Sequence, residues 1–213
     1  MEILTRIAGM LRQGEDEQVH ALVREALDSG LSPREVLDGG LIAGMNVVGD
    51  QFRLREIFLP DVLLAARAMY AGLDVLKPLL ARDGVATRGT IVVGSVQGDL
   101  HDIGKNLVGI MLKGAGFEVV DLGNDVPPDR FVDAAVSAGA SVIGMSALLT
   151  TTMAVMKDVV ALVDARGLRG RVKTIVGGAP VSEAFARDIG ADAYGFDAAN
   201  AVERVRALVD SRA

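Results

Sequence analysis

The feature that most constrains the fold of this 213-residue chain is a regular alternation of short β-branched runs with helix-length amphipathic stretches from Thr90 onward. Strands separated by helices form a parallel sheet, because each connection must cross back over the sheet. We therefore expect an α/β, Rossmann-like (flavodoxin-like) domain with a doubly wound sheet of five parallel strands. The predicted strands are Thr90–Val96, Glu118–Leu122, Ser141–Ser146, Lys173–Gly177 and Ala191–Tyr194, and the last helix is Ala198–Val209.

The chain up to about Leu80 follows a different pattern, in which apolar residues recur every three or four positions, as in a helix. Ser32-Pro-Arg-Glu35 is typical of a capping box with proline in the first helical position. It predicts a third helix toward Val48, and a fourth helix runs from near Pro60. Four helices with short connections indicate a four-helix bundle. We interpret Ala81–Gly89 as the linker, which gives a helical domain over 1–88 and a Rossmann-like domain over 89–213.

The composition limits what kind of site the protein can build. It has 22 Lys and Arg against 28 Asp and Glu, a net charge of −6 with no basic block, which argues against nucleic-acid binding. The absence of cysteine excludes disulfides, iron–sulfur clusters and thiolate zinc sites. Because His20 and His101 are its two histidines, a three-histidine metal centre is excluded as well. A metal would need ligands from outside the protein.

Half of the residues are hydrophobic, which raises the question of a membrane span. Charges interrupt the apolar stretches every few residues, as in Asp61–Arg67, and no stretch approaches the roughly 20 apolar residues that a spanning helix needs. The N-terminus has an acidic second residue and lacks the basic start and apolar run of a secretory signal. We expect a soluble, cytoplasmic protein with no membrane partner.

Three predicted loops at the carboxyl ends of strands carry unusual residues. Parallel α/β sheets bind ligands past those ends, where the winding reverses. Gly98–Gly104 follows the first strand and contains Asp99 and His101, Ser146–Thr152 follows the third, and Gly177–Pro180 follows the fourth. The first loop is not a dinucleotide-binding fingerprint, because Asp and His replace its middle glycines. A flavin or nicotinamide site is therefore poorly supported.

His101 is the side chain in these loops with the most distinctive chemistry. A carboxylate at Asp99 can bond one ring nitrogen and raise the basicity of the other, as at metal-ligating histidines. Gly104 would let another group approach the start of the next helix. Each loop also has a purely structural interpretation, as a local hydrogen bond, a helix cap at Ser146 or Thr150, or a glycine turn. Their occurrence at one end of one sheet favours a ligand site.

Taken together, the three loops resemble the three-part signature of the cobalamin-binding fold: Asp99-x-His101-x-x-Gly104, Ser146-x-Leu148 and Gly177-Gly178. The chain is similar to the cobalamin module of methionine synthase, to base-off mutases and, most closely, to the corrinoid proteins of anaerobic methyltransferase systems. The resemblance covers almost the whole chain, because Met45–Phe52 and Phe58–Val62 resemble the helical cap over the cofactor's upper face in the methyl-transfer branch.

The resemblance implies a role for each matching residue. His101 would be the lower axial ligand to the cobalt of cobalamin or a related corrinoid, in place of the cofactor's own dimethylbenzimidazole. Asp99 would bond its other nitrogen, and Thr152, where methionine synthase has a serine, would complete the relay. The cofactor tail would enter a deep slot. The other implied cofactor-binding residues are Asp102 and Ile103, the slot residues Gly104, Ser146, Leu148, Thr150, Gly177 and Gly178, and the apolar shield of Phe52, Leu59 and Val62.

The resemblance also implies a function, that of a corrinoid methyl carrier that alternates between Co(I) and methyl-Co(III). Such a protein is a subunit of a multicomponent methyltransferase rather than a complete enzyme. A substrate-specific methyltransferase would methylate it from a methylamine, methanol or a methoxylated aromatic compound. A second methyltransferase would pass the methyl group to tetrahydrofolate or coenzyme M, and a reductive activase would rescue oxidised Co(II). During transfer the helical domain would swing aside about the linker.

Three other classes of protein share parts of this pattern. A cobalamin-dependent sensor or regulatory protein is the main alternative, although the charge of −6 and the absence of tryptophan argue against DNA-binding and light-sensing forms. A small mutase subunit would share the cofactor fold but usually lacks a methyl-shielding helical cap. A flavodoxin-like electron carrier would need a phosphate loop and aromatic residues around a flavin. Asp121–Asp125, after the second strand, would approach the corrin edge without a catalytic role.

Overall fold

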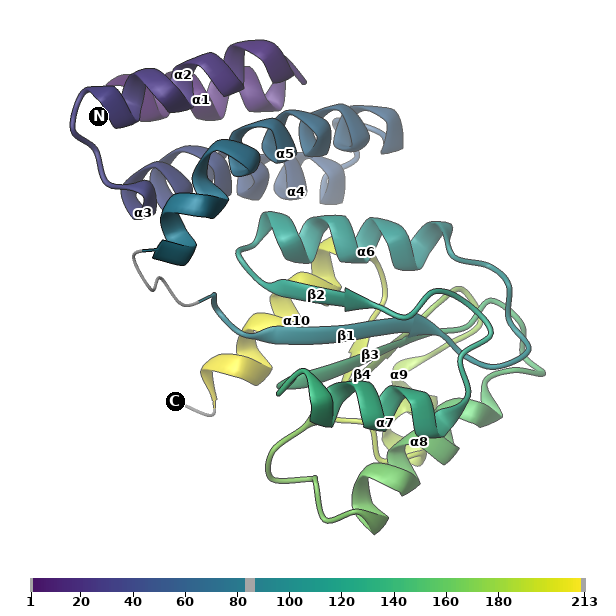
Figure 1. Cartoon of the computed structure of the whole chain (residues 1–213). Coiled ribbons are helices and arrows are strands. Elements are labelled where there is room, and N and C mark those ends of the chain that lie inside the picture. The colour runs from purple at the N-terminus through teal and green to yellow at the C-terminus, as the bar shows by residue number, and fades with distance from the viewer. Residues whose placement is uncertain (1, 83–86, 212–213) are drawn as a thin grey trace. The chain divides into compact units, whose positions relative to one another are not determined.

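A computed structural model of the chain describes residues 2–82 and 87–211 (Figure 1). The chain divides into two compact units, one of Met1–Ala86 with Gly114–Gly116 and one of Thr87–Lys113 with Phe117–Ala213. Helices α1 to α5 belong to the first unit, and the sheet belongs to the second. None of the helices in the described part of the chain combines the length and the apolar run that crossing a membrane requires.

The first unit is helical, as predicted. The apolar stripes of its first two helices are buried, with Ile7 and Val23 fully inaccessible to solvent. The predicted capping box is present, because Ser32 Oγ accepts the N–H of Glu35 at 3.3 Å and Glu35 Oε2 accepts the N–H of Ser32 at 2.9 Å. The elements are α1 (Glu2–Arg12), α2 (Asp16–Asp28), α3 (Pro33–Val36), the π-helical turn η1 (Leu37–Ile42), α4 (Ala43–Arg53) and α5 (Leu59–Arg82).

Two details of the first unit differ from the prediction. The helix expected from Ser32 toward Val48 contains the π-helical turn η1. A β-carbon on Gly40 in that turn would lie 3.0 Å from Ile7 Cγ2, so the glycine allows α1 to pack closely there. The linker expected at Ala81–Gly89 begins later, because α5 continues through Arg82, and its residues 83–86 lie outside the described residues.

The second unit contains the predicted sheet of five parallel strands, in the order β2-β1-β3-β4-β5. The Val and Ile residues of the strands that begin at Thr90, Val142 and Lys173 are buried, as in sheets that helices cover on both faces. The first four strands match their predicted bounds to within one residue, and β5 begins two residues later than predicted. The strands are β1 (Thr90–Ser95), β2 (Glu118–Asp121), β3 (Val142–Ser146), β4 (Lys173–Gly177) and β5 (Ala193–Gly195).

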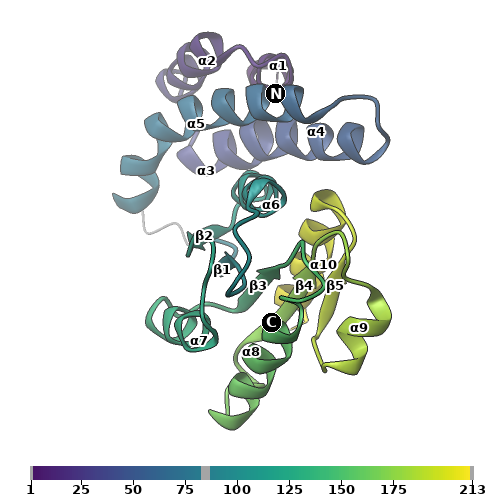
Figure 2. The same cartoon turned by 90° about the vertical axis from the view of Figure 1, so that its right-hand side faces the viewer.

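Helices cover both faces of the sheet, which confirms the doubly wound architecture (Figure 2). Helices α6 (Ile103–Gly114) and α10 (Ala198–Asp210) lie on one face, and α7 (Pro128–Ser137) and α8 (Ala154–Ala165) lie on the other. The short helix α9 (Glu183–Asp188) connects β4 to β5. A continuous apolar core between the sheet and α7 and α8 includes the fully buried Phe131, Ile143, Met156 and Val159.

The carboxyl ends of the central strands are aligned. Ser95 of β1 lies beside Ser146 of β3, which lies beside Gly177 of β4 and, through it, Gly195 of β5. The winding reverses between β1 and β3, because β2 lies on one side of β1 and β3 to β5 lie on the other. Ligands bind at such a reversal in open α/β sheets. Asp99, His101 and Thr152 belong to the two loops that follow β1 and β3.

Candidate functional site

The loop between β1 and α6 holds His101 at this edge of the sheet. The N–H of Asp99 donates to the carbonyl of Val96 at 3.0 Å and closes a tight turn, in which Gly98 has a φ of +83°. A positive φ at that position favours glycine. Ser95 Oγ donates to the carbonyl oxygen of His101 at 2.6 Å, which ties the far side of the loop to the end of β1.

The imidazole of His101 is paired with a buried carboxylate. Its Nδ1 lies 2.9 Å from Oδ1 of Asp99, and its backbone N–H donates to the same oxygen at 3.1 Å. Asp99 is fully buried, whereas 54% of the His101 side chain is exposed. An ionised carboxylate only accepts hydrogen bonds, so Nδ1 carries the proton and Nε2 keeps its lone pair. The structure therefore leaves Nε2 as the nitrogen that can bind a metal.

The second carboxylate oxygen of Asp99 is held by the loop after β3. Oδ2 accepts the backbone N–H of Leu148 at 2.7 Å and that of Leu149 at 3.1 Å. Thr152 Oγ1 also lies 2.9 Å from Oδ2 and 2.9 Å from the carbonyl oxygen of Leu149, and its single proton can serve one of them at a time. The structure thus brings His101, Asp99 and Thr152 together in one chain of hydrogen bonds.

The electrostatics of Asp99 favour its ionised form. Burial by itself raises the pKa of this carboxyl group, because it removes water from the charge. The hydrogen bonds from the Leu148 N–H, from the ring and N–H of His101 and from the Thr152 hydroxyl outweigh burial and lower the pKa of Asp99 well below its usual range. Asp99 therefore stays negatively charged at neutral pH and faces Nδ1 of the imidazole with an acceptor oxygen.

Exposed apolar side chains lie at the end of the sheet that carries the His101 loop. They come from the loops that follow β1, β3 and β5 and from the first residue of α6. Large apolar groups gathered at one edge of a domain mark a binding surface. A corrin, which brings four equatorial nitrogens and needs one axial ligand from the protein, fits an apolar rim with a single held imidazole. The rim residues are Leu100 (69% exposed), Ile103 (73%), Leu148 (43%), Leu149 (41%) and Phe196 (62%).

The predicted slot residues lie at the same edge, with different local environments. A β-carbon on Gly104 would meet no atom within 4 Å, so open space exists at the start of α6. Close packing of neighbouring backbone atoms favours glycine at positions 177 and 178. A β-carbon on Gly177 would lie 2.9 Å from the carbonyl oxygen of Gly195, and one on Gly178, with φ +124°, would collide with the carbonyl oxygen of Ala147. These two glycines therefore let the β4 loop pass against its neighbours.

The remaining predicted residues are placed as follows. Asp102 is half-buried and its carbonyl oxygen accepts the N–H of Asn106 at 2.8 Å, which starts α6. Thr150 is exposed in the β3 loop, between Leu149 and Thr152. In the helical unit, Phe52 of α4 and Leu59 of α5 are partly buried and Val62 of α5 is fully buried, while the neighbouring Phe58 is 68% exposed.

Several contacts of the site were not predicted. The backbone N–H groups of Leu148 and Leu149 bind Asp99, and backbone donors leave no signature in residue type. The hydroxyl of Ser95 holds the carbonyl of His101, a contact that its place at the end of a predicted strand could have indicated. The acidic loop after β2 contacts the His101 loop through Asp125, whose carboxylate accepts the N–H of Gly98 at 2.7 Å.

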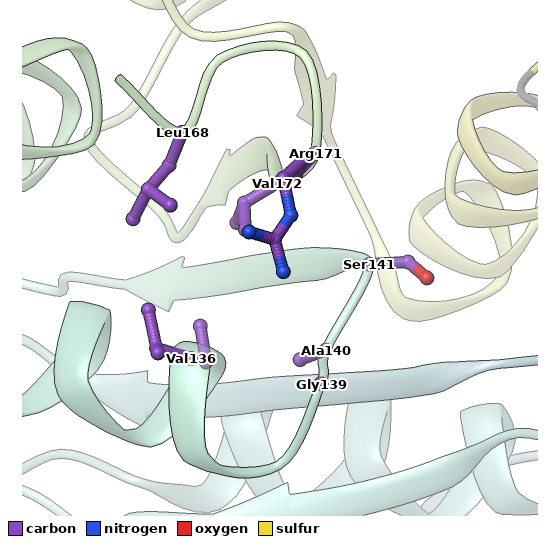
Figure 3. A pocket seen from close by; sticks show the side chains of 8 residues that line it. Val136, Gly139, Ala140, Ser141, Leu168, Arg171 and Val172 are labelled. Carbon is purple, nitrogen blue, oxygen red and sulfur yellow. The ribbon is translucent and has the colours of Figure 1, made fainter. Parts of the chain in front are cut away.

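A separate pocket lies at the opposite end of the strands, where β3 and β4 begin (Figure 3). It is enclosed by the end of α7 and by the loop between α8 and β4. Arg171 is its charged side chain, and it contains none of the predicted site residues. The lining residues are Ala135, Val136, Gly139, Ala140, Ser141, Leu168, Arg171 and Val172.

Both units match known protein families. A model described as a B12 binding domain matches residues 89–206, and a second model of the same description matches residues 3–77. The chain is 43% identical to trimethylamine corrinoid protein 2 of Methanosarcina acetivorans over 99% of this chain and 98% of the relative. It is 44% identical to dimethylamine corrinoid protein 1 of the same organism over 98% of each chain.

Among solved structures, the chain is likewise similar to cobalamin-binding proteins. The methanol:cobalamin methyltransferase complex of Methanosarcina barkeri contains a chain that is 33% identical, with a TM-score of 0.87 over 98% of this chain and 80% of that chain. A cobalamin-binding protein from Desulfitobacterium hafniense is 32% identical, with a TM-score of 0.79 over 96% of this chain and 98% of that chain. With a helical unit, a doubly wound parallel sheet and a carboxylate-held histidine at the switch point, this chain belongs to the family of B12-binding corrinoid proteins.

Proposed function

We propose that this protein is a corrinoid methyl carrier in which His101 supplies the lower axial ligand. The observation that carries the proposal is the pairing of the exposed His101 imidazole with the buried, ionised Asp99 through Nδ1, at 2.9 Å. This pairing leaves the lone pair of Nε2 for a metal. The bound corrinoid would supply a cobalt centre that accepts and releases a methyl group, chemistry that no side chain of this protein provides.

The role proposed for Asp99 and Thr152 is to control the proton of His101. With a metal bound at Nε2, Asp99 would accept the hydrogen bond from Nδ1–H and fix the orientation of the ring. If Nε2 were released, it could take up a proton, and the carboxylate of Asp99 would face the resulting charge from 2.9 Å. Thr152, which can donate to Asp99 or to the carbonyl of Leu149, can follow that change of charge by reorienting its hydroxyl. Ligand release and proton uptake would thus be coupled.

The other predicted residues have positions that support binding of the corrinoid. Open space beside Gly104 and the aligned small residues Ser146 and Gly177 offer an entrance for the cofactor tail, with Gly178, Thr150 and the backbone of Leu148 at its border. Asp102 and Ile103 form the start of α6 beside it. We propose that Phe52 and Leu59 shield the upper face, backed by Val62, and that the exposed Phe58 contributes to the same shield.

The proposed partners are a substrate-specific methyltransferase, a second methyltransferase that uses tetrahydrofolate or coenzyme M, and a reductive activase. The identities of 43% and 44% to trimethylamine and dimethylamine corrinoid proteins exceed the 33% to a chain of a methanol system. These values favour a methylated amine as the methyl donor. Donor specificity itself would belong to the partner enzyme.

Reconstitution with cobalamin tests the axial ligand. The purified protein is refolded or incubated with hydroxocobalamin, and the visible spectrum is recorded after unbound cofactor is removed. We expect a base-off, His-on spectrum for the wild type and for His20→Ala, which removes the other, exposed histidine on α2. His101→Ala should lose the His-on spectrum and retain the wild-type circular dichroism. A wild type that binds no corrinoid would overturn the proposal, and an unchanged His101→Ala spectrum would overturn the ligand assignment.

The carrier role needs a separate assay. The loaded protein is reduced to Co(I) and mixed with a purified trimethylamine or dimethylamine methyltransferase and its amine, and methylation is followed by the loss of Co(I) absorbance. Methylation in the presence of enzyme and amine, and its absence when either is omitted, is the expected result. A protein that binds corrinoid His-on but accepts a methyl group from none of the methylamine, methanol and methoxy-aromatic methyltransferases would not be a carrier.

A further inference from the structure

The loop between β2 and α7 is fastened directly to the residues that precede His101. The N–H of Asp125 donates to the carbonyl oxygen of Asp99 at 3.1 Å, and the carboxylate of Asp125 accepts the N–H of Gly98 at 2.7 Å. Asn124 Nδ2 donates to the carbonyl oxygen of Leu100 at 3.3 Å. Two consecutive residues of one loop thus hold three consecutive residues of the other.

Asp125 adopts an uncommon backbone conformation to make these contacts. Its φ is +53°, and Arg55 is the other non-glycine residue with a positive φ in the described part of the chain. Left-handed backbone is unfavourable for most residues, but Asp and Asn tolerate it better because their short side chains bond nearby backbone groups. In this conformation both the N–H and the carboxylate of Asp125 reach the turn at Gly98 and Asp99.

The other end of the same loop is anchored by a buried lysine. Lys105 of α6, whose side chain is 3% exposed, places Nζ 2.5 and 2.6 Å from the two carboxylate oxygens of Asp121. Asp121 Oδ1 also accepts the N–H of Gly123 at 2.9 Å, and the carbonyl of Gly123 accepts the N–H of Ser95 at 3.0 Å. The segment from 121 to 125 is therefore fixed at both ends and can serve as a rigid support.

The two supports of Asp99 act on different parts of the residue. The β3 loop holds its carboxylate through Leu148, Leu149 and Thr152, whereas Asp125 holds its backbone and that of Gly98. Both supports bear on the pairing of Asp99 with His101, because the direction of the side chain depends on the orientation of the backbone that carries it.

We propose that Asp125 is a positioning residue for the metal-ligating histidine. Its carboxylate and N–H fix the turn at Gly98 and Asp99, so that Oδ1 of Asp99 meets Nδ1 of His101 and the lone pair stays on Nε2. The inference extends the proposed function, because the corrinoid is the ligand that the positioned nitrogen would bind. Asp125 acts through its hydrogen bonds to Gly98 and Asp99, which in turn carry the carboxylate that meets the imidazole.

Two substitutions separate the carboxylate of Asp125 from its backbone conformation. Asp125→Asn keeps a side-chain oxygen acceptor and tolerates the positive φ. Asp125→Gly keeps the N–H and adopts the positive φ without strain, so it should fold, but it loses the acceptor for Gly98. Arg55→Gly is the matched control, since it relieves the other positive φ at a distance in sequence from every predicted site residue of the sheet unit.

The first measurement uses the protein without cofactor. The tautomer of each histidine is read from ¹⁵N chemical shifts at one neutral pH, and the chain offers two histidines, so His20 serves as an internal reference. Wild type, Asp125→Asn and Arg55→Gly should hold His101 as the Nδ1–H tautomer. In Asp125→Gly the ratio of Nε2–H to Nδ1–H should rise roughly three- to tenfold, the expected effect of losing one supporting hydrogen bond. An unchanged ratio would overturn the proposal.

The second measurement uses the cobalamin-loaded protein. The His-on fraction at the same pH should be high for wild type, Asp125→Asn and Arg55→Gly, and lower for Asp125→Gly by a similar factor. If the wild type takes up no cobalamin, the proposed function fails while the tautomer measurement still decides the role of Asp125. If the wild type is His-on and Asp125→Gly equals it in both measurements, the positioning role is wrong and the proposed function stands.

Discussion

Leu148 donates its backbone N–H to Oδ2 of Asp99 across 2.7 Å, although the two residues are 49 positions apart. The bond ties the loop after β1 to the loop after β3, the two strands between which the winding reverses. It also leaves Oδ1 of Asp99 for His101. The fold thus holds the carboxylate with backbone groups and presents the histidine at the surface.

Replacing Asp99 with asparagine should move the ring proton of His101 from Nδ1 to Nε2, the nitrogen proposed to bind the metal. Oδ2 meets three donors, from Leu148, Leu149 and Thr152, so the amide oxygen will take that side and the NH₂ group will face the imidazole. Nδ1 must then accept, which puts the proton on Nε2. We expect ¹⁵N chemical shifts of the cofactor-free variant to report the Nε2–H tautomer and its cobalamin complex to lose the His-on spectrum. Asp188→Asn, an exposed change on α9, should change neither, and an Nδ1–H tautomer in Asp99→Asn would contradict the argument.

The lowered pKa of Asp99 predicts a particular dependence of stability on pH. Its pKa is lower in the folded protein than in the unfolded chain, where it is about 3.9, so the unfolded chain binds more protons between the two values. The stabilisation that depends on the ionised Asp99 is fully present above about pH 5 and is lost as the pH falls further toward the folded pKa. The difference in unfolding free energy between wild type and Asp99→Asn, measured by urea denaturation, should therefore shrink steadily as the pH falls from 5 toward 3. Parallel pH profiles for the two proteins would contradict the lowered pKa.

The hydroxyl of Thr152 should contribute more to the free energy of unfolding than its methyl group does. Thr152→Val keeps the shape but removes the donor to the buried carboxylate, and hydrogen bonds to charged groups contribute about 1.5–3 kcal/mol. Thr152→Ser keeps the hydroxyl and removes a methyl group that lies beside the turn at Gly98. Urea denaturation should show a loss of about 2 kcal/mol for Thr152→Val and about 1 kcal/mol or less for Thr152→Ser. The reverse order would mean that packing, rather than the hydrogen bond to Asp99, is the main role of this residue.

The sequence allowed β1, β3 and β4 to be located because each is a largely buried run that contains β-branched residues and ends at serine or glycine. The pairing of Asp99 with His101 could be predicted because the two residues are neighbours in the chain. The contact of Thr152 with Asp99 followed from the family resemblance alone, since it spans 53 positions. The π-helical turn at η1 and the left-handed backbone of Asp125 were not predictable, because each depends on packing against a distant segment.

Among the glycines at the site, Gly178 should be the one whose replacement lowers the free energy of unfolding most. Its φ of +124° is accessible essentially to glycine, and a β-carbon there would collide with the carbonyl oxygen of Ala147. Gly178→Ala therefore has to move the β4 loop away from the β3 loop, at a cost on the order of 3 kcal/mol, the sum of backbone strain and overpacking. Gly167→Ala is the matched control, since Gly167 has φ +67° and open space around it. This variant should lose only about 1 kcal/mol of unfolding free energy.

Thermal and urea denaturation of the two glycine variants give these losses directly. Because the β3 loop carries the amides that hold Asp99, the displacement caused by Gly178→Ala should also disturb His101. A folded Gly178→Ala protein is therefore expected to bind cobalamin with a reduced His-on fraction, while Gly167→Ala keeps the wild-type spectrum. Equal losses of stability in the two variants would mean that the β4 loop can shift freely. In that case the close approach of Gly178 to Ala147 would have no part in holding the site.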